Sequence, residues 1–322
     1  MKKSFTLIEA ILVIVILSFI LIGGFQLISK LYLRNYIVKQ TSHFEFISQQ
    51  IADQLALMLY YRIPLTTIGY NPSNNDFKYI GQIDDNEHSV LEWIGYLNDA
   101  MKESNLSGFI DLYASDKNTK TLVCKDFNKN FIQNIVNNKF DIPDNTDINK
   151  TTAIIFAGSF DRGEEGALND YNNSFGWHGN EHKLVFTFDS GAKTDSNNNT
   201  NLTLNDFRNG RIYEKFYLAD SAYAVVRKGD LNPNDWNCSD LSWNEADEDD
   251  LLLFYNYRPW LGETFCADKN HNGSPKGDVT VLASNVKAFR VKKINSHLEI
   301  KITMGKQKGD VNITVSKQKV AF

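Results

Sequence analysis

Near its N-terminus the chain carries an apolar segment long enough to cross a membrane. No basic residue occurs between Lys3 and Lys30, and from Phe5 to Ile28 the only polar side chains are Thr6, Glu9, Ser18 and Gln26. A helix of these 24 residues is about 36 Å long, and the hydrocarbon core of a bilayer is about 30 Å thick. The sequence therefore predicts a single transmembrane helix over residues 5–28.

Glu9 places an acid near the start of this helix. A carboxylate inside a membrane costs about 3 kcal/mol on insertion scales, and a buried acid is tolerated when it has a partner charge. Two interpretations follow. Either the side chain reaches the headgroup layer from the end of the helix, or it meets a cation within the membrane.

The residues around this acid resemble the prepilin signature of type IV pilins and type II secretion pseudopilins. The resemblance consists of Lys2 and Lys3, the small residue Ser4, the sequence Phe-Thr-Leu-Ile-Glu and a long apolar helix, and it covers residues 2–28. At the junction the family has Gly where this chain has Ser4.

The resemblance implies a processing step and an assembly step. A prepilin peptidase would cleave between Ser4 and Phe5, removing residues 1–4 as a leader peptide and leaving Phe5 as an N-methylated terminus. Glu9 would then pair with the N-terminal amine of a neighbouring subunit. The family also implies an inner-membrane location with the head in the periplasm or outside. The charges do not fix this orientation, because basic residues flank the helix at both ends.

Two other interpretations of this segment are a secretory signal peptide, which fits its residues less well, and a plain membrane anchor. A secretory signal peptide has an apolar region of about 7–15 residues before a small-x-small site. The segment here is longer, and Gly23-Gly24-Phe25 is a poor cleavage site. A plain membrane anchor is compatible with the same residues.

The helical pattern continues beyond the apolar segment. One face carries Ile37, Phe44, Ile47, Ile51, Leu55 and Met58, spaced as on an α-helix. The sequence therefore predicts one helix over residues 5–62, amphipathic over residues 29–62 and ended by Pro64. Gly23 and Gly24 each weaken it by about 1 kcal/mol relative to Ala, and we expect a bend or a point of local melting there. The amphipathic face either packs on the head, as in pilins, or forms a coiled-coil dimer.

The remaining residues, 63–322, are predicted to form a globular α+β head. With 42% hydrophobic residues in 322 the chain can bury a substantial core, and its net charge of −5 argues against general nucleic-acid binding. Successive strand patterns with few helices between them favour antiparallel sheets. Helices are expected at Trp93–Lys102 and Asn130–Asn137, and strands at Gly108–Ala114, Thr121–Lys125, Thr152–Phe156, Lys183–Phe188, Ile212–Leu218, Ala222–Arg227, Leu251–Tyr257, Val279–Leu282, Val286–Lys292, Leu298–Met304 and Val311–Ser316.

The last strands carry a second resemblance. The run from Thr280 to Val291, followed by a turn and a strand from Leu298 to Ile302, is similar to J-type minor pseudopilins and W-type minor pilins. Any hairpin of two amphipathic strands fits the same pattern.

Two features of the head concern ligands and cross-links. Asp268, Asn270 and Asn272 followed by Gly273 match the opening of a calcium loop, although the Glu expected at its twelfth position is absent. An Asx-rich turn without metal explains the same residues. Of the three cysteines, Cys238 and Cys266 flank one segment and form the favoured disulfide, with Cys124 as the odd thiol, while other pairings stay open.

No catalytic arrangement is expected. The sequence His178-Gly179-Asn180-Glu181-His182 has the spacing of a zinc peptidase motif, but glycine and a following strand pattern argue against the helix that this chemistry needs. The aromatic run Phe254–Trp260 is interpreted as one face of a strand. The acidic run Glu245–Asp250 is interpreted as a solvated face.

These observations predict a minor pilin or pseudopilin, not an enzyme. Its partners would be other pilins through the N-terminal helix, prepilin peptidase, the inner-membrane assembly platform and the membrane itself. The alternatives are the membrane-anchored, ligand- or DNA-binding head of a competence pilus and an anchored exported enzyme.

Overall fold

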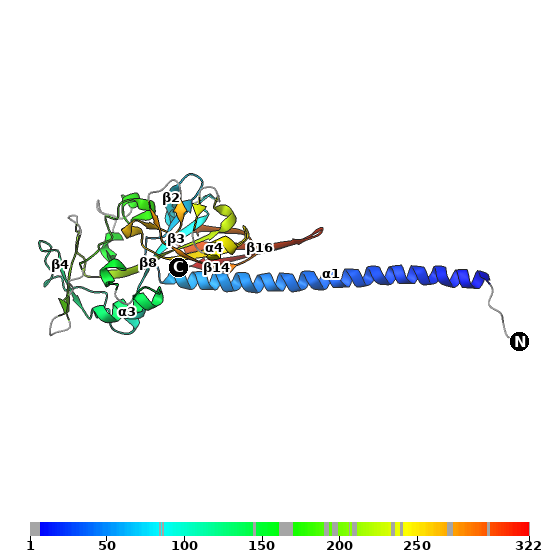
Figure 1. Ribbon diagram of the computed structural model, residues 1–322, viewed down its shortest axis with the longest axis horizontal. Helices are drawn as coiled ribbons and strands as arrows, with labels where there is room; N and C mark the ends of the chain where they lie inside the picture. The colour runs from blue at the N-terminus through cyan, green and yellow to red at the C-terminus, as the bar shows by residue number, and fades with distance from the viewer. Residues whose placement is uncertain are drawn as a thin grey trace.

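The computed structural model describes a long N-terminal helix attached to an α+β head (Figure 1). The described residues are 7–83, 85, 87–143, 146–160, 170–189, 193–194, 199–205, 207, 211–232, 236–238, 241–268, 273–294 and 297–321. Helix α1 spans Leu7–Tyr60, close to the expected range. It runs through Gly23 and Gly24 without a break, so the expected bend is absent. Glycine lowers helix stability without forcing a turn, and no atom lies within 4 Å of where either Cβ would stand.

The centre of the head is an antiparallel sheet of seven strands. Its order is β14-β10-β8-β3-β1-β2, and β5 pairs with the first part of β8. The strands are β1 (Ile68–Asn71), β2 (Asp76–Tyr79), β3 (Val90–Tyr96), β5 (Ala153–Phe156), β8 (Phe216–Arg227), β10 (Leu251–Tyr257) and β14 (Asp278–Ala283).

A second antiparallel sheet follows at the C-terminal end. It consists of β15 (Val286–Ile294), β16 (His297–Lys308) and β17 (Val311–Ala321), with β16 in the middle. The hairpin of β16 and β17 extends beyond the rest of the head, on the side from which α1 emerges (Figure 1). The hairpin expected from the sequence is the pair of β15 and β16, which is present, with both strands longer than their patterns indicated.

Smaller elements complete the head. Strands β4, β7 and β6 form a third antiparallel sheet at the end away from the projecting half of α1, and two two-residue pairings join β12 to β9 and β11 to β13. The bounds are α2 (Asn98–Lys102), α3 (Lys129–Lys139), α4 (Leu241–Glu245), β4 (Thr121–Lys125), β6 (Lys193–Thr194), β7 (Asn199–Thr203), β9 (Trp236–Asn237), β11 (Glu263–Thr264), β12 (Ala267–Asp268) and β13 (Ser274–Pro275). Short 3-10 helices are η1 (Ile80–Gln82), η2 (Ile148–Lys150), η3 (Ala157–Phe160), η4 (Tyr171–Asn173), η5 (Trp177–Gly179), η6 (Lys228–Asp230) and η7 (Pro259–Leu261).

The second half of α1 belongs to the hydrophobic core of the head. Phe44, Ile51 and Leu55 are buried in one cluster with side chains of the central sheet and of β15–β17. Ile37, Ile47 and Met58, from the same predicted face, pack against this cluster. The amphipathic face of the helix is thus occupied by the chain's own head.

Several expected elements differ from the structure. The helix expected from Trp93 is wrong over its first residues, because β3 continues to Tyr96 and the helix begins only at Asn98. Five of the first six residues of β3 are apolar or Gly and all six are buried, which is typical of a central strand. The strands expected at Ile212–Leu218 and Ala222–Arg227 are parts of the single strand β8.

Two expected strands do not form. The segments Gly108–Ala114 and Lys183–Phe188 make only isolated bridges, at Phe109 and Ile110 in the first and at Phe186 and Phe188 in the second. Each segment meets its neighbours at single residues, so no continuous ladder develops.

Candidate functional site

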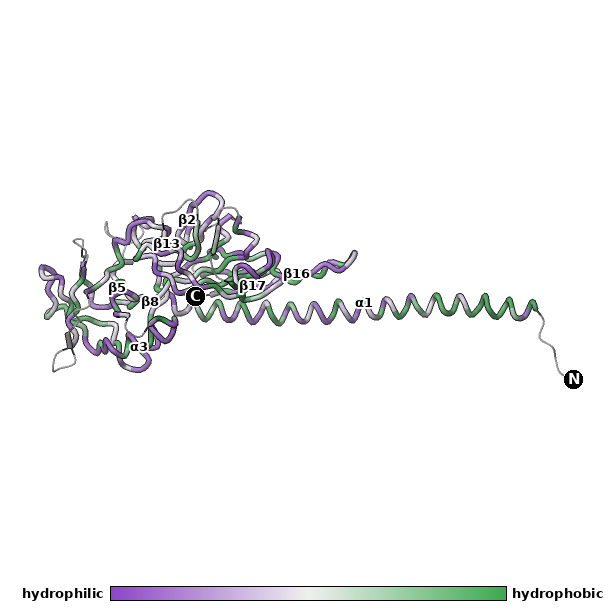
Figure 2. Tube along the Cα trace, viewed as in Figure 1, coloured by the Kyte–Doolittle hydropathy of each residue, from purple (hydrophilic) through white to green (hydrophobic). Residues whose placement is uncertain are grey.

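The N-terminal half of α1 presents a continuous apolar surface. Between Leu7 and Ile28 the large apolar side chains are 48–81% exposed, and within the described chain no other element covers them. Figure 2 shows this half as a predominantly hydrophobic rod projecting from the head. The most apolar window of the helix has a mean hydropathy of 2.8, so by length and composition α1 is able to cross a membrane.

Glu9 lies exposed in the first turn of α1. An acid at this place interacts favourably with the partial positive charge of the helix N-terminus. Ser4 and Phe5, the residues of the expected cleavage site, lie outside the described residues. Cleavage and the pairing of Glu9 with an amine therefore remain predictions.

The other half of α1 is held to the C-terminal sheet by polar contacts as well as by the core. Lys319 on β17 forms a salt bridge with Asp53, whose pKa is lowered by hydrogen bonds from Gln49 and Lys319. Nearer the exposed apolar half, the Nζ of Lys308 lies 4.1 Å from the centroid of the Tyr36 ring. These contacts fix where the helix leaves the head.

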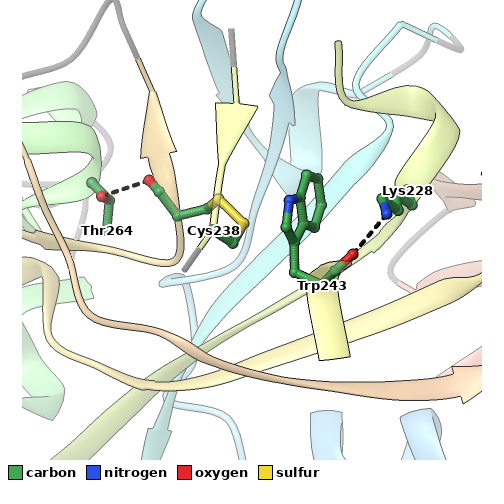
Figure 3. The surroundings of a disulfide bond; sticks show 5 residues. Lys228, Cys238, Trp243 and Thr264 are labelled. Atoms are coloured by element: carbon green, nitrogen blue, oxygen red, sulfur yellow. Dashed lines mark hydrogen bonds between the residues drawn. A yellow bond between two sulfur atoms is a disulfide. The ribbon is translucent and has the colours of Figure 1, made fainter. Parts of the chain in front are cut away.

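Cys238 and Cys266 are joined by a disulfide, with their Cα atoms 5.0 Å apart. Figure 3 shows it with Thr264 on one side, whose hydroxyl donates to the carbonyl of Cys266 at 3.0 Å, and Trp243 on the other. Cys124 is a buried free thiol whose pKa is raised by burial. The disulfide lies directly beside the two-residue pairing of β9 with β12 and holds these short strands together covalently.

The predicted calcium loop begins at this disulfide. The backbone of Asp268 ends β12 and pairs with Trp236, whereas Asn270 and Asn272 lie outside the described residues. Over the ranges that the structure describes, no three His, Cys, Asp or Glu side chains are grouped to hold a metal. Calcium binding at this loop therefore stays a prediction.

The two histidines of the zinc-peptidase spacing face different partners. His178, held in η5 with a φ of 52°, places its Nε2 2.7 Å from the Oε1 of Glu92 in the core. The Nδ1 of His182 lies 3.1 Å from the carbonyl oxygen of Val185. The hydroxyl of Tyr257 donates to the second oxygen of Glu92 at 2.8 Å, so the three groups form a buried network.

A second buried charge, the carboxylate of Asp220, joins α3 to β8. Lys139, the last residue of α3, donates to the fully buried Asp220 on β8 at 2.6 Å. Burial acts to lower the pKa of Lys139, but the attraction of Asp220 outweighs it and the net shift is upward. Burial also raises the pKa of the neighbouring Tyr223 to about 12. No sequence pattern indicates this pair, whose members are 81 positions apart.

The candidate site is therefore the exposed half of α1 with Glu9 at its start. The networks around Glu92 and Asp220 are buried inside the head. Both connect strands and helices that are distant in the sequence. No family model, curated protein or solved structure matches this chain.

Proposed function

We propose that the chain is a minor pilin or pseudopilin. It is anchored by α1, cleaved by prepilin peptidase between Ser4 and Phe5, and assembled into a filament based in the inner membrane, as in a type IV pilus or a type II secretion pseudopilus. The observation that carries the proposal is the uncovered apolar half of α1, with Glu9 in its first turn, rising from a folded α+β head. A surface of this kind is stable in lipid or among other apolar helices, and not in water.

The function is association and not catalysis. In the membrane the apolar half contacts lipid, and in the filament it packs against the same halves of neighbouring subunits. A pair between Glu9 and the amine of a neighbour sets the axial register, because an acid among apolar helices is tolerated in one position only. A head built from most of the chain's 322 residues suits a specialised minor subunit.

Mass spectrometry of the N-terminus tests the processing step. The protein isolated from its membrane should lack residues 1–4 and begin with a methylated Phe5. Recovery of the chain with Met1 intact contradicts the proposal and leaves an anchored protein of another class.

Substitution of Glu9 tests the assembly step. Glu9→Val should insert normally but fail to join filaments. Loss of one partner of a buried pair costs about 3–5 kcal/mol, which lowers incorporation by about a hundredfold or more. Glu45→Val, at another exposed acid of α1, is the matched control and should incorporate like the natural chain. Incorporation of Glu9→Val at the natural level removes the register role.

A further inference from the structure

We infer that the end of the β16–β17 hairpin contacts anionic phospholipid headgroups at the face of the membrane from which α1 emerges. The inference rests on the anchoring in the proposed function, and is independent of cleavage and assembly. It assigns a second contact between the head and the membrane, in addition to α1.

The C-terminal sheet is strongly basic. Residues 286–321 contain nine Lys or Arg and two Asp or Glu, a net charge of +7, whereas the whole chain carries −5 and the remainder therefore −12. Four of the nine are neutralised by acids of the head, in the pairs Lys287–Asp249, Arg290–Asp230, Lys292–Glu299 and Lys319–Asp53. Lys306 and Lys308, at the end of the hairpin, are exposed and form no salt bridge within the described residues. They are two of the five basic residues of this sheet without an acid partner among the described residues; the ammonium of Lys308 lies against the Tyr36 ring, and both stand at the end of the hairpin, where an anionic surface can reach them.

The hairpin end lies at the level of the membrane surface. It projects from the head alongside α1 (Figure 1), and the 4.1 Å contact of Lys308 with the Tyr36 ring fixes its height on the helix. Tyr36 is eight residues beyond Ile28, or about 12 Å along the helix axis. The headgroup layer is about 5–8 Å thick on each side of the hydrocarbon core, and a lysine side chain extends its charge several ångströms further. The lysines of the hairpin end therefore come within reach of the lipid phosphates.

The helix adds three more basic residues at this height. Lys30, Arg34 and Lys39 are exposed on α1, and no acidic residue occurs in the sequence between residues 29 and 44. With Lys306 and Lys308 they form a basic collar of five residues, opposed at the hairpin end by Asp310. On the cytoplasmic side of membranes, clusters of about four to eight Lys or Arg next to a transmembrane helix bind anionic lipids, and the same electrostatic attraction acts at any leaflet that contains anionic phospholipid.

A flat anionic surface fits this collar better than a nucleic acid. The collar lies close to the membrane plane, and charges further from that plane than a Debye length of about 10 Å are screened from it. A long polyanion that followed the head would instead meet the net negative charge of the remaining chain.

The test uses the full chain reconstituted into vesicles, with a fluorescent bimane probe at the hairpin end. Gln307→Cys supplies the attachment site, because Cys124 is buried and Cys238 is joined to Cys266. The vesicles contain a lipid with a nitroxide on its headgroup as quencher, in a background of phosphatidylcholine with or without 30% phosphatidylglycerol. We expect strong quenching in the anionic vesicles, weak quenching in the neutral ones, and a loss of the difference at high salt.

Charge reversal of Lys306→Glu with Lys308→Glu should abolish the anionic quenching. Each lysine near an anionic surface strengthens its attachment about fivefold, so the two together change the occupancy of the contact about 25-fold or more. Lys117→Glu with Lys120→Glu, beside β4 at the opposite end of the head, is the matched control and should leave the quenching unchanged.

Four results overturn the inference. Equal quenching in neutral and anionic vesicles removes the role of lipid charge. An inserted chain without quenching places the hairpin away from the headgroups, while the proposed anchoring stands. A chain that alkaline carbonate extracts from the vesicles contradicts the anchoring itself. Binding of labelled duplex DNA by the chain in detergent, lost with the same two substitutions and accompanied by no lipid quenching, assigns the hairpin to nucleic acid instead.

Discussion

At the scale of single residues, Glu92 shows how the head accommodates a charge in its core. The carboxylate is 1% exposed and contacts the imidazole of His178 through one oxygen and the hydroxyl of Tyr257 through the other. A buried carboxylate is costly unless its oxygens accept hydrogen bonds. The network therefore links β3, η5 and β10 at a point where apolar packing alone would not specify their mutual position.

Removal of one donor should destabilise the head measurably. We expect Tyr257→Phe to lower the free energy of unfolding by about 1–3 kcal/mol, because one oxygen of Glu92 loses its partner inside the core. Urea unfolding of the full chain in detergent, followed by tryptophan fluorescence, measures the change. Tyr113→Phe removes a hydroxyl from a fully exposed ring and should stay within about 0.5 kcal/mol of the natural chain.

The same substitution has a pH signature. Burial, together with the nearby Glu92, raises the pKa of Tyr257 well above its ordinary value. The unfolded chain releases this proton near pH 10 and the folded chain holds it, so above pH 10 the natural protein loses about 1.4 kcal/mol of stability per pH unit through this group. Tyr257→Phe lacks this loss, and the difference between the two proteins should shrink above pH 10. A difference that stays constant up to pH 12 contradicts a buried, protonated Tyr257.

At the scale of elements, α1 shows what the sequence could predict. Its apolar and amphipathic halves follow helical spacing over the whole range, and strands β4 and β10 occur at the expected residues because alternating or continuous apolar runs specify them locally. The helix predicted from Trp93 is wrong because the partner strand of β3 lies far away in the sequence: β3 pairs with β8, more than 100 residues later. Elements that depend on such pairings carry little local signal.

The buried contact between α1 and the C-terminal sheet should make a large contribution to the stability of the head. Leu55 is fully buried in the core shared with β15–β17, whereas Leu57, on the same helix, is 60% exposed. We expect Leu55→Ala to lower the free energy of unfolding by about 2–5 kcal/mol through the lost contacts and the cavity, and Leu57→Ala to change it by less than about 0.5 kcal/mol. Urea unfolding in detergent compares the two variants. Equal effects contradict the packing of this face on the head.

At the scale of the whole molecule, the sequence predicted the candidate site better than it predicted the interior. The apolar half of α1 and the position of Glu9 are properties of one contiguous segment, so the sequence alone places both on one helix. Lys139 with Asp220 and His178 with Glu92 are separated by 81 and 86 positions. Only the folded head brings such pairs together, and no motif marks them beforehand.

The shared core makes a specific prediction about where the head can be cut from the anchor. Phe44, Ile51, Leu55 and Leu59 are each at most 3% exposed, and burying a side chain of this size contributes about 1.5–3 kcal/mol. Together they contribute about 6–12 kcal/mol, comparable with the net stability of about 5–15 kcal/mol of a whole protein. A chain of residues 63–322 should therefore unfold or aggregate.

A chain of residues 36–322 is the matched comparison. It keeps the core residues of α1 and the contact of Tyr36 with Lys308, while it lacks the exposed apolar half that demands lipid or other helices. We expect it to be a folded monomer in water, with cooperative unfolding, whereas residues 63–322 elute as aggregates in size-exclusion chromatography. If residues 63–322 form a monomer that unfolds cooperatively, α1 is only an appendage of the head. The stabilisation of the head by the second half of α1 is then contradicted.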